Sequence, residues 1–94
     1  MPHYVYIMAS RPGGALYTGR TQNLRKRVEA HRAGLSTHTS TYNIRTLVWF
    51  EEHLDFDTSL QRERAIKRWR RAWKNALITE LNPDWKDIAH MVPD

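Results

Sequence analysis

The stretch that decides the fold runs from Tyr4 to Arg20 and reads YVYIMASRPGGALYTGR. Its first part, Tyr4 to Ala9, is rich in β-branched and aromatic residues that alternate along the chain, which predicts a strand. Arg-Pro-Gly-Gly at 11–14 is turn chemistry, because proline fixes φ and glycine permits a positive φ. Leu16 to Arg20 then predicts the second strand of an antiparallel hairpin, with Tyr6 and Tyr17 on neighbouring strands and able to face one pocket.

Downstream of the hairpin, the pattern predicts one helix, a loop and a third strand. Asn23 suits the N-cap of a helix over Leu24 to Arg32, and Gly34 suits the position just after its end. Residues 36–43 are polar and rich in hydroxyls, so we expect an exposed loop there. Thr46 to His53 predicts a strand whose apolar run favours the centre of the sheet.

The rest of the chain has a helical pattern that reaches Leu81, where Asn-Pro follows. The N-cap is expected at Asp57 or Thr58, with Thr58 and Gln61 forming a capping box. The pattern fits one long helix or two helices broken near residues 70–71. The order strand-strand-helix-strand-helix(-helix) predicts an α+β fold with a three-stranded antiparallel sheet flanked by helices.

Length and composition predict one domain over residues 1–94, with a motif region at 4–81 and a tail at 82–94. Trp85 in the tail is expected to pack back on the body. Trp49, Trp69 and Trp73 are expected in the core, although Trp69, Trp73 and Trp85 could also stack on bases. The sequence has no cysteine, no secretory signal and no apolar run near the ~20 residues of a membrane helix, so a cytoplasmic location is expected.

Charge points to a polyanionic partner. The net charge is +5, and residues 62–74 hold seven basic residues against the single acidic residue Glu63. Such a segment favours nucleic acid, although a solvated helix face is the plainer alternative. Glu63 itself has two interpretations, an ion pair with Lys67 four residues on, or a ligand of Mg²⁺ or Mn²⁺ completed by water and phosphate. Arg27 is likewise either a surface arginine or a clamp for a phosphate group.

Tyr4-Val5-Tyr6, Tyr17-Thr18-Gly19, Arg27 and Glu63, in this order, resemble the GIY-YIG nuclease superfamily, and above all its small stand-alone bacterial members. Tyr4 stands where the first triplet has glycine, and Thr18 where the second has isoleucine. The resemblance covers Tyr4 to about Trp85. It implies an endonuclease that hydrolyses DNA or RNA, with DNA favoured, using one Mg²⁺ or Mn²⁺ ion on Glu63.

The resemblance also assigns roles to residues. The catalytic residues it implies are Tyr6, Tyr17, Arg27, His31 and Glu63, with either tyrosine activating water if nearby cations lower its pKa. His31 would be an orienting group, a proton shuttle or a phosphate contact, and His38 is a weaker candidate. Substrate contacts are expected from Gly19, Arg20, Arg25, Lys67, Arg70 and Lys74, of which Gly19 permits close approach. Lys67, Arg70 and Lys74 follow Glu63 at helical spacing and would share its side of a helix.

The sequence contains no additional domain that would read a target. We therefore expect selection by nucleic-acid shape rather than by sequence, or delivery by a partner protein. A monomer or a weak homodimer is expected. The alternatives are a nucleic-acid-binding module without catalysis, using the same basic surface, and a domain that binds an acidic protein.

Overall fold

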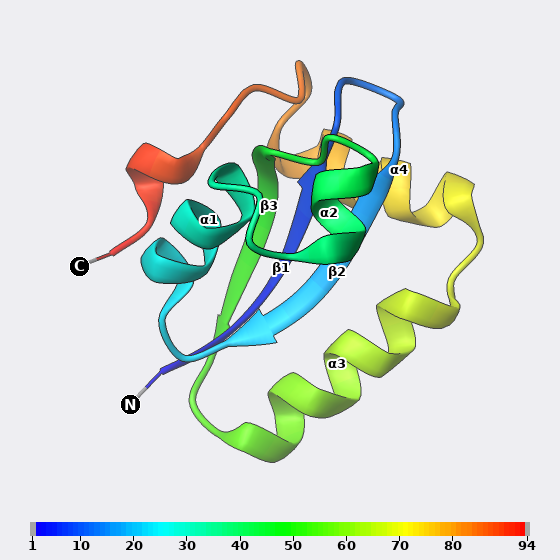
Figure 1. Ribbon diagram of the computed structural model, residues 1–94. Coiled ribbons are helices and arrows are strands. Elements are labelled where there is room, and N and C mark those ends of the chain that lie inside the picture. Colours follow the sequence, from blue (N-terminus) through cyan, green and yellow to red (C-terminus); the bar gives the residue numbers. More distant parts are fainter. Residues whose placement is uncertain (1, 94) are drawn as a thin grey trace.

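The structure is a computed structural model that describes residues 2–93. Its elements are β1 (His3–Ala9), β2 (Leu16–Thr21), α1 (Leu24–Arg32), α2 (Thr37–Thr41), β3 (Thr46–His53), α3 (Phe56–Arg68), α4 (Arg71–Leu81) and the 3₁₀ helix η1 (Ala89–Met91). Three strands and the helices α1, α3 and α4 follow in the order predicted, and the short helix α2 and the 3₁₀ helix are additional (Figure 1). The predicted α+β class and antiparallel sheet are confirmed.

The sheet has the order β2-β1-β3, so β1 lies at its centre. The prediction that the third strand is central was wrong, and β3 is an edge strand that pairs only with β1. The pairing of β1 with β3 shifts between Ile7 and Met8, which places Val48 and Trp49 together against one face of the sheet. The apolar run in β3 therefore reflects a bulge and a covered face rather than a central position.

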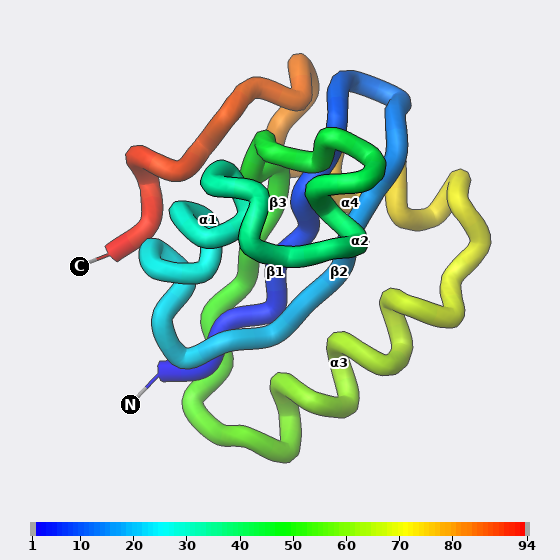
Figure 2. Tube along the Cα trace, viewed as in Figure 1, coloured from blue at the N-terminus to red at the C-terminus, as the bar shows by residue number. Residues whose placement is uncertain are grey.

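The first face of the sheet is covered by α1 and the C-terminal tail. Tyr4, Tyr6 and Met8 of β1 pack there against Leu24 and Val28 of α1. In Figure 2 the tail after α4 runs past α1, and its Ile88 and Val92 complete this cluster. Tyr6 is fully buried, so this face holds polar side chains inside the core.

The second face is covered by α3 and α4. Ile66 of α3 and Ile78 of α4 bury completely against Val5 and Ile7, and Trp85 closes the cluster, as predicted for the tail. The helices are separate because Trp69 and Arg70 have extended backbone, with ψ of 148° and 156°. This joint lets α4 turn back onto the sheet, and α4 lies behind it in Figure 1.

The joint also changes the environment of the tryptophans. Trp69 is half-buried against the second-face cluster, but Trp73 in the first turn of α4 is 54% exposed. The expected burial of Trp73 was therefore wrong, because a break of two extended residues resets the helical phase. Trp49 lies in the core as predicted, at 4% exposure.

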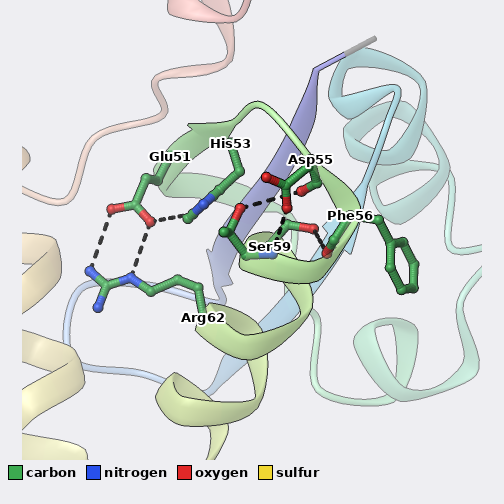
Figure 3. Close-up of polar contacts among 7 residues, drawn as sticks. Glu51, His53, Asp55, Phe56, Ser59 and Arg62 are labelled. Atoms are coloured by element: carbon green, nitrogen blue, oxygen red, sulfur yellow. Dashed lines mark hydrogen bonds and ion pairs between the residues drawn. The ribbon is translucent and has the colours of Figure 1, made fainter.

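The start of α3 differs from the prediction. Asp55 is the N-cap, and its Oδ1 accepts a hydrogen bond of 2.8 Å from the Thr58 backbone N–H (Figure 3). Further along, Arg62 bonds both carboxylate oxygens of Glu51 on β3, at 3.1 and 3.4 Å. The predicted cap at Asp57 or Thr58 was wrong because the first helical turn begins earlier, at Phe56.

Residues 37–41 form the short helix α2 where an exposed loop was predicted. Thr39 is fully buried, and α2 lies in front of the sheet beside α1 (Figure 1). Within residues 2–93, no helix is long and apolar enough to cross a membrane.

Candidate active site

Two tyrosines meet over a glycine on the first face of the sheet. Gly19 of β2 pairs with Tyr6 of β1, and the ring centroids of Tyr6 and Tyr17 are 6.2 Å apart. A Cβ on Gly19 would lie 2.6 Å from the Tyr6 hydroxyl and 2.9 Å from Cε2 of Tyr17. Glycine is therefore required here so that both phenols can pack on the strand. The close approach that Gly19 permits is therefore that of Tyr6 and Tyr17 to the strand.

Behind the tyrosines, a histidine connects α1 to α2. The Tyr6 hydroxyl lies 2.9 Å from Nε2 of His31, and Nδ1 of His31 lies 3.0 Å from Oγ1 of Thr39. The Thr39 hydroxyl also donates to the Ser36 carbonyl oxygen at 3.3 Å. All three side chains are essentially buried, at 0% exposure for Tyr6 and Thr39 and 1% for His31. Burial and the Arg27 charge lower the pKa of His31, which keeps the ring neutral at pH 7.

Arg27 lies one turn before His31 on α1 and acts on both phenols. Hydrogen bonding and charge interaction with Tyr6 raise the pKa of Arg27, and Tyr17 adds to the effect. The residue as a whole is exposed, so Arg27 is open to solvent while it interacts with the phenols. This arrangement suits a contact with a phosphate group.

At Tyr6, burial outweighs the lowering of the pKa that a nearby cation supplies. Burial raises the pKa of Tyr6 to about 12, and the opposing effect of Arg27 is smaller. Tyr6 therefore remains a neutral phenol at pH 7. Tyr17 is half-buried, and its ring lies 5.1 Å from the ring of His31 and 5.9 Å from that of His38 on α2.

Across the edge strand β2, the acidic side of the site comes from α3. Glu63 has a 14% exposed side chain, and its Oε2 lies 3.1 Å from Nζ of Lys67. Its Oε1 lies 3.9 Å from Nε of Arg20, and the Arg20 guanidinium stacks over Phe56 at 4.4 Å. Arg20 Nε is buried and has no hydrogen-bond partner. Burial is the main cause of the raised pKa of the Tyr6 phenol, and the charge of Glu63 adds to it in the same direction.

Three predicted substrate contacts lie elsewhere. The Arg25 guanidinium bonds the Val92 carbonyl oxygen at 2.8 Å, on the side of α1 toward the tail. Arg70 stacks on Trp73 at 5.1 Å, and Lys74 follows in α4. The extended joint separates these two residues from Glu63, and of the predicted row only Lys67 shares α3 with it.

Thr39 and Phe56 were missed by sequence reasoning. Thr39 lies in a hydroxyl-rich segment where nothing local distinguishes it from its neighbours, and its partner His31 is eight residues away. Phe56 reaches Arg20 only because α3 packs along β2.

Glu63 is the carboxylate of this site that could hold a metal ion. Among residues 2–93, no group of three or more histidine and acidic side chains could hold an ion together. A single recessed carboxylate beside Arg20 would suit Mg²⁺ or Mn²⁺, which keep several waters and use substrate oxygens as ligands. The donor set fits such an ion only in the presence of substrate.

The fold and this arrangement define a small α+β domain that gathers two phenols, a guanidinium and a carboxylate at an edge strand. The family model of the GIY-YIG catalytic domain matches residues 2–76. The chain therefore belongs to the GIY-YIG family, as the two triplets predicted. GIY-YIG domains are nuclease domains, so family membership implies a nucleic-acid substrate.

Relatives of similar length support this assignment. The chain is 35% identical over 79 residues to the UPF0213 protein SH2523 of Staphylococcus haemolyticus. This match covers 83% of this chain and 95% of the relative. It is 37% identical over 79 residues to the UPF0213 protein NP_0776A of Natronomonas pharaonis, covering 83% and 92%. The solution NMR structure of the UPF0213 protein BH0048 from Bacillus halodurans matches over the full length of both chains, with a TM-score of 0.59 and 23% identity. That similarity shows the fold.

Proposed function

We propose that the protein is a metal-dependent endonuclease that hydrolyses phosphodiester bonds in DNA or RNA. The observation that carries the proposal is the meeting of Tyr6 and Tyr17 over Gly19 on β2, with Arg27 interacting with both phenols and Glu63 paired with Arg20 of the same strand. In this proposal a phenol and the arginine that would bind the phosphate lie on one side, and the carboxylate lies on the other. Hydrolysis of a phosphodiester needs such groups on the attacking and leaving sides of phosphorus.

The tyrosines take different roles in this proposal. Tyr6 is fully buried and its pKa is raised to about 12, so it is unsuited to contact or deprotonate water. Tyr17 is half-buried and therefore the phenol that orients the attacking water. The new P–O bond forms as the bond from phosphorus to the leaving oxygen breaks, and the attacking water gives its proton to solvent, directly or through the Tyr17 hydroxyl, which releases its own proton to solvent as it accepts this one.

Charge stabilisation comes from Arg27 and from the α3 side of the site. Arg27 neutralises the negative charge that develops on the phosphoryl oxygens. Glu63 would hold the divalent ion, which as a Lewis acid stabilises the leaving oxygen when bound. Arg20 and Lys67, which both contact Glu63, would bind neighbouring phosphates. Such contacts would be made to the nucleic-acid backbone, so they favour selection of the substrate by its shape rather than by its sequence.

A cleavage assay tests this function. Labelled single-stranded, duplex and branched DNA, and RNA, are incubated with Mg²⁺, with Mn²⁺ and with a chelator. Wild type is compared with Arg27→Ala, Arg27→Lys and Glu63→Gln, and the exposed Glu80→Gln on α4 serves as the matched control. We expect metal-dependent cutting that falls by ~10²–10³-fold in Arg27→Ala. It should also be lost in Glu63→Gln and retained in Glu80→Gln.

Two results would overturn the proposal. If every substrate stays intact while all variants still bind nucleic acid with a steep salt dependence, the protein is a binding module without catalysis. If no binding is seen, the basic surface serves a different acidic partner.

A further inference from the structure

The buried groups between α1 and α2 form a chain of hydrogen bonds with fixed ends. Arg27 is at one end, next to the Tyr6 phenol, and a guanidinium can only donate. The Ser36 carbonyl is at the other end and can only accept. Tyr6, His31 and Thr39 lie between, joined at 2.9 and 3.0 Å. Each of these three can donate and accept, so the two ends determine the direction.

The direction follows step by step from the Ser36 end. Thr39 has one hydroxyl proton, which it gives to the Ser36 carbonyl oxygen. Its oxygen therefore accepts from Nδ1–H of His31. Since His31 is neutral, its Nε2 then carries a lone pair and accepts the Tyr6 proton. The Tyr6 oxygen is left with its lone pairs toward Arg27.

We propose that Thr39 is a positioning residue that holds His31 in the Nδ1–H tautomer and thereby fixes the Tyr6 oxygen as the acceptor that anchors Arg27. In the opposite tautomer, Nε2–H of His31 would donate to Tyr6. The phenol proton would then point toward a guanidinium that cannot accept it. These hydrogen bonds thus couple the His31 tautomer, which Thr39 of α2 sets, to the position of Arg27 on α1. The tautomer itself is independent of catalysis, but its effect on cleavage rests on the proposed function.

Three variants separate this role from plain packing. Thr39→Val keeps the shape and removes the hydroxyl, while Thr39→Ser keeps the hydroxyl. Thr41→Val is the matched control, because the Thr41 hydroxyl makes the same kind of bond to a helix carbonyl, at 2.8 Å to Thr37, without a histidine partner. Thermal unfolding checks that each variant folds. Ring ¹⁵N shifts of His31 by NMR report the tautomer.

We expect wild type, Thr39→Ser and Thr41→Val to show His31 protonated at Nδ1. Thr39→Val should shift His31 to the Nε2–H form or to a mixture, and should lower kcat for cleavage by about tenfold or more, since general acid–base and orienting groups contribute ~10²–10⁴-fold. Thr39→Ser should retain activity.

An Nε2–H tautomer in wild type would overturn the inference, and so would an unchanged tautomer in Thr39→Val. If the tautomer shifts as expected but cleavage is unchanged, the positioning role is refuted. If wild type cleaves nothing, the proposed nuclease function fails, and the NMR result alone decides whether Thr39 sets the tautomer. If Thr39→Val does not fold, an Nδ1–H tautomer in wild type and Thr39→Ser supports the inference, and an Nε2–H tautomer in either refutes it.

Discussion

The two halves of the candidate site are built in opposite ways. On the α1–α2 side, Tyr6, His31 and Thr39 are buried, neutral and joined by hydrogen bonds of 2.9 and 3.0 Å. On the α3 side, Glu63 and Arg20 are charged, partly exposed and 3.9 Å apart, beyond hydrogen-bond distance. Buried polar groups must be paired, and this fixes their geometry. Partly exposed charges can exchange partners, so the α3 side can adjust to a phosphate or a metal ion.

The largest expected effects come from removing the two phenol hydroxyls one at a time. Tyr17→Phe should lower cleavage by ~10²–10⁴-fold while leaving stability nearly unchanged, because its ring is half-exposed. Tyr6→Phe should cost stability of about 1–3 kcal/mol, because it leaves the buried Nε2 of His31 without a partner. Urea unfolding and cleavage rates measure both effects. Equal loss of stability in both variants would contradict the distinction between the buried Tyr6 hydroxyl and the half-exposed Tyr17.

Gly19→Ala should disturb the α1–α2 side directly. The new Cβ would meet the Tyr6 hydroxyl at 2.6 Å and the Tyr17 ring at 2.9 Å, so both side chains must move. A shift of about 1 Å in catalytic groups can cost ~10²-fold in rate. Gly34→Ala is the control for stability, because its φ of +76° makes alanine costly by ~1–2 kcal/mol away from the tyrosines. If both variants keep the same activity, Gly19 is not a support for the site.

Much of this arrangement was predictable because it is local. The hairpin, α1 and the positions of Tyr6, Tyr17 and Arg27 follow from alternation, turn residues and a cap within 30 residues of sequence. The burial of Tyr6 was not predictable, because the C-terminal tail, distant in sequence, completes with α1 the cover that raises the pKa of Tyr6. Burial raises the pKa of Tyr6 and Arg27 lowers it, and the balance between these two effects depends on tertiary packing.

The predictions that were wrong failed for the same reason, because they depend on tertiary packing. Residues 37–41 are as polar as a loop, and α2 forms there with Thr39 buried beside His31. The place of β3 at the sheet edge depends on pairing with β1, more than 35 residues away. The exposure of Trp73 depends on a joint whose function is to return α4 to the sheet. Periodicity describes a face of one element and does not describe what covers it.

The pH dependence of stability should carry a contribution from His31 on the buried side. Burial and Arg27 lower the pKa of His31 below its ordinary 6.5. As the pH falls from 6.5 toward the folded-state pKa, the unfolded chain takes up a proton that the folded chain does not. Stability is therefore full above 6.5 and is lost through this window, by up to ~1.4 kcal/mol per pH unit.

Variants of two histidines test whether stability falls below pH 6.5 because of His31. The free energy of unfolding of His31→Gln should depend less steeply on pH below 6.5 than that of wild type. His90→Gln, which changes an exposed histidine, should keep the wild-type slope. The same slope in all three proteins would show that His31 is not held neutral by the fold.

The smallest effect is expected on the α3 side, from Lys67→Met. Its side chain is 51% exposed, and the ion pair with Glu63 at 3.1 Å spans one helical turn, so stability should change by no more than ~0.5 kcal/mol. Because the ammonium competes with a metal ion for the carboxylate, we expect Mn²⁺ to bind Lys67→Met about twofold more tightly, the ratio that corresponds to such an energy. Electron paramagnetic resonance titration of Mn²⁺, with a non-cleavable oligonucleotide present, measures this. Glu63→Gln should abolish the binding, and unchanged Mn²⁺ affinity in that variant would show that the ion is held elsewhere.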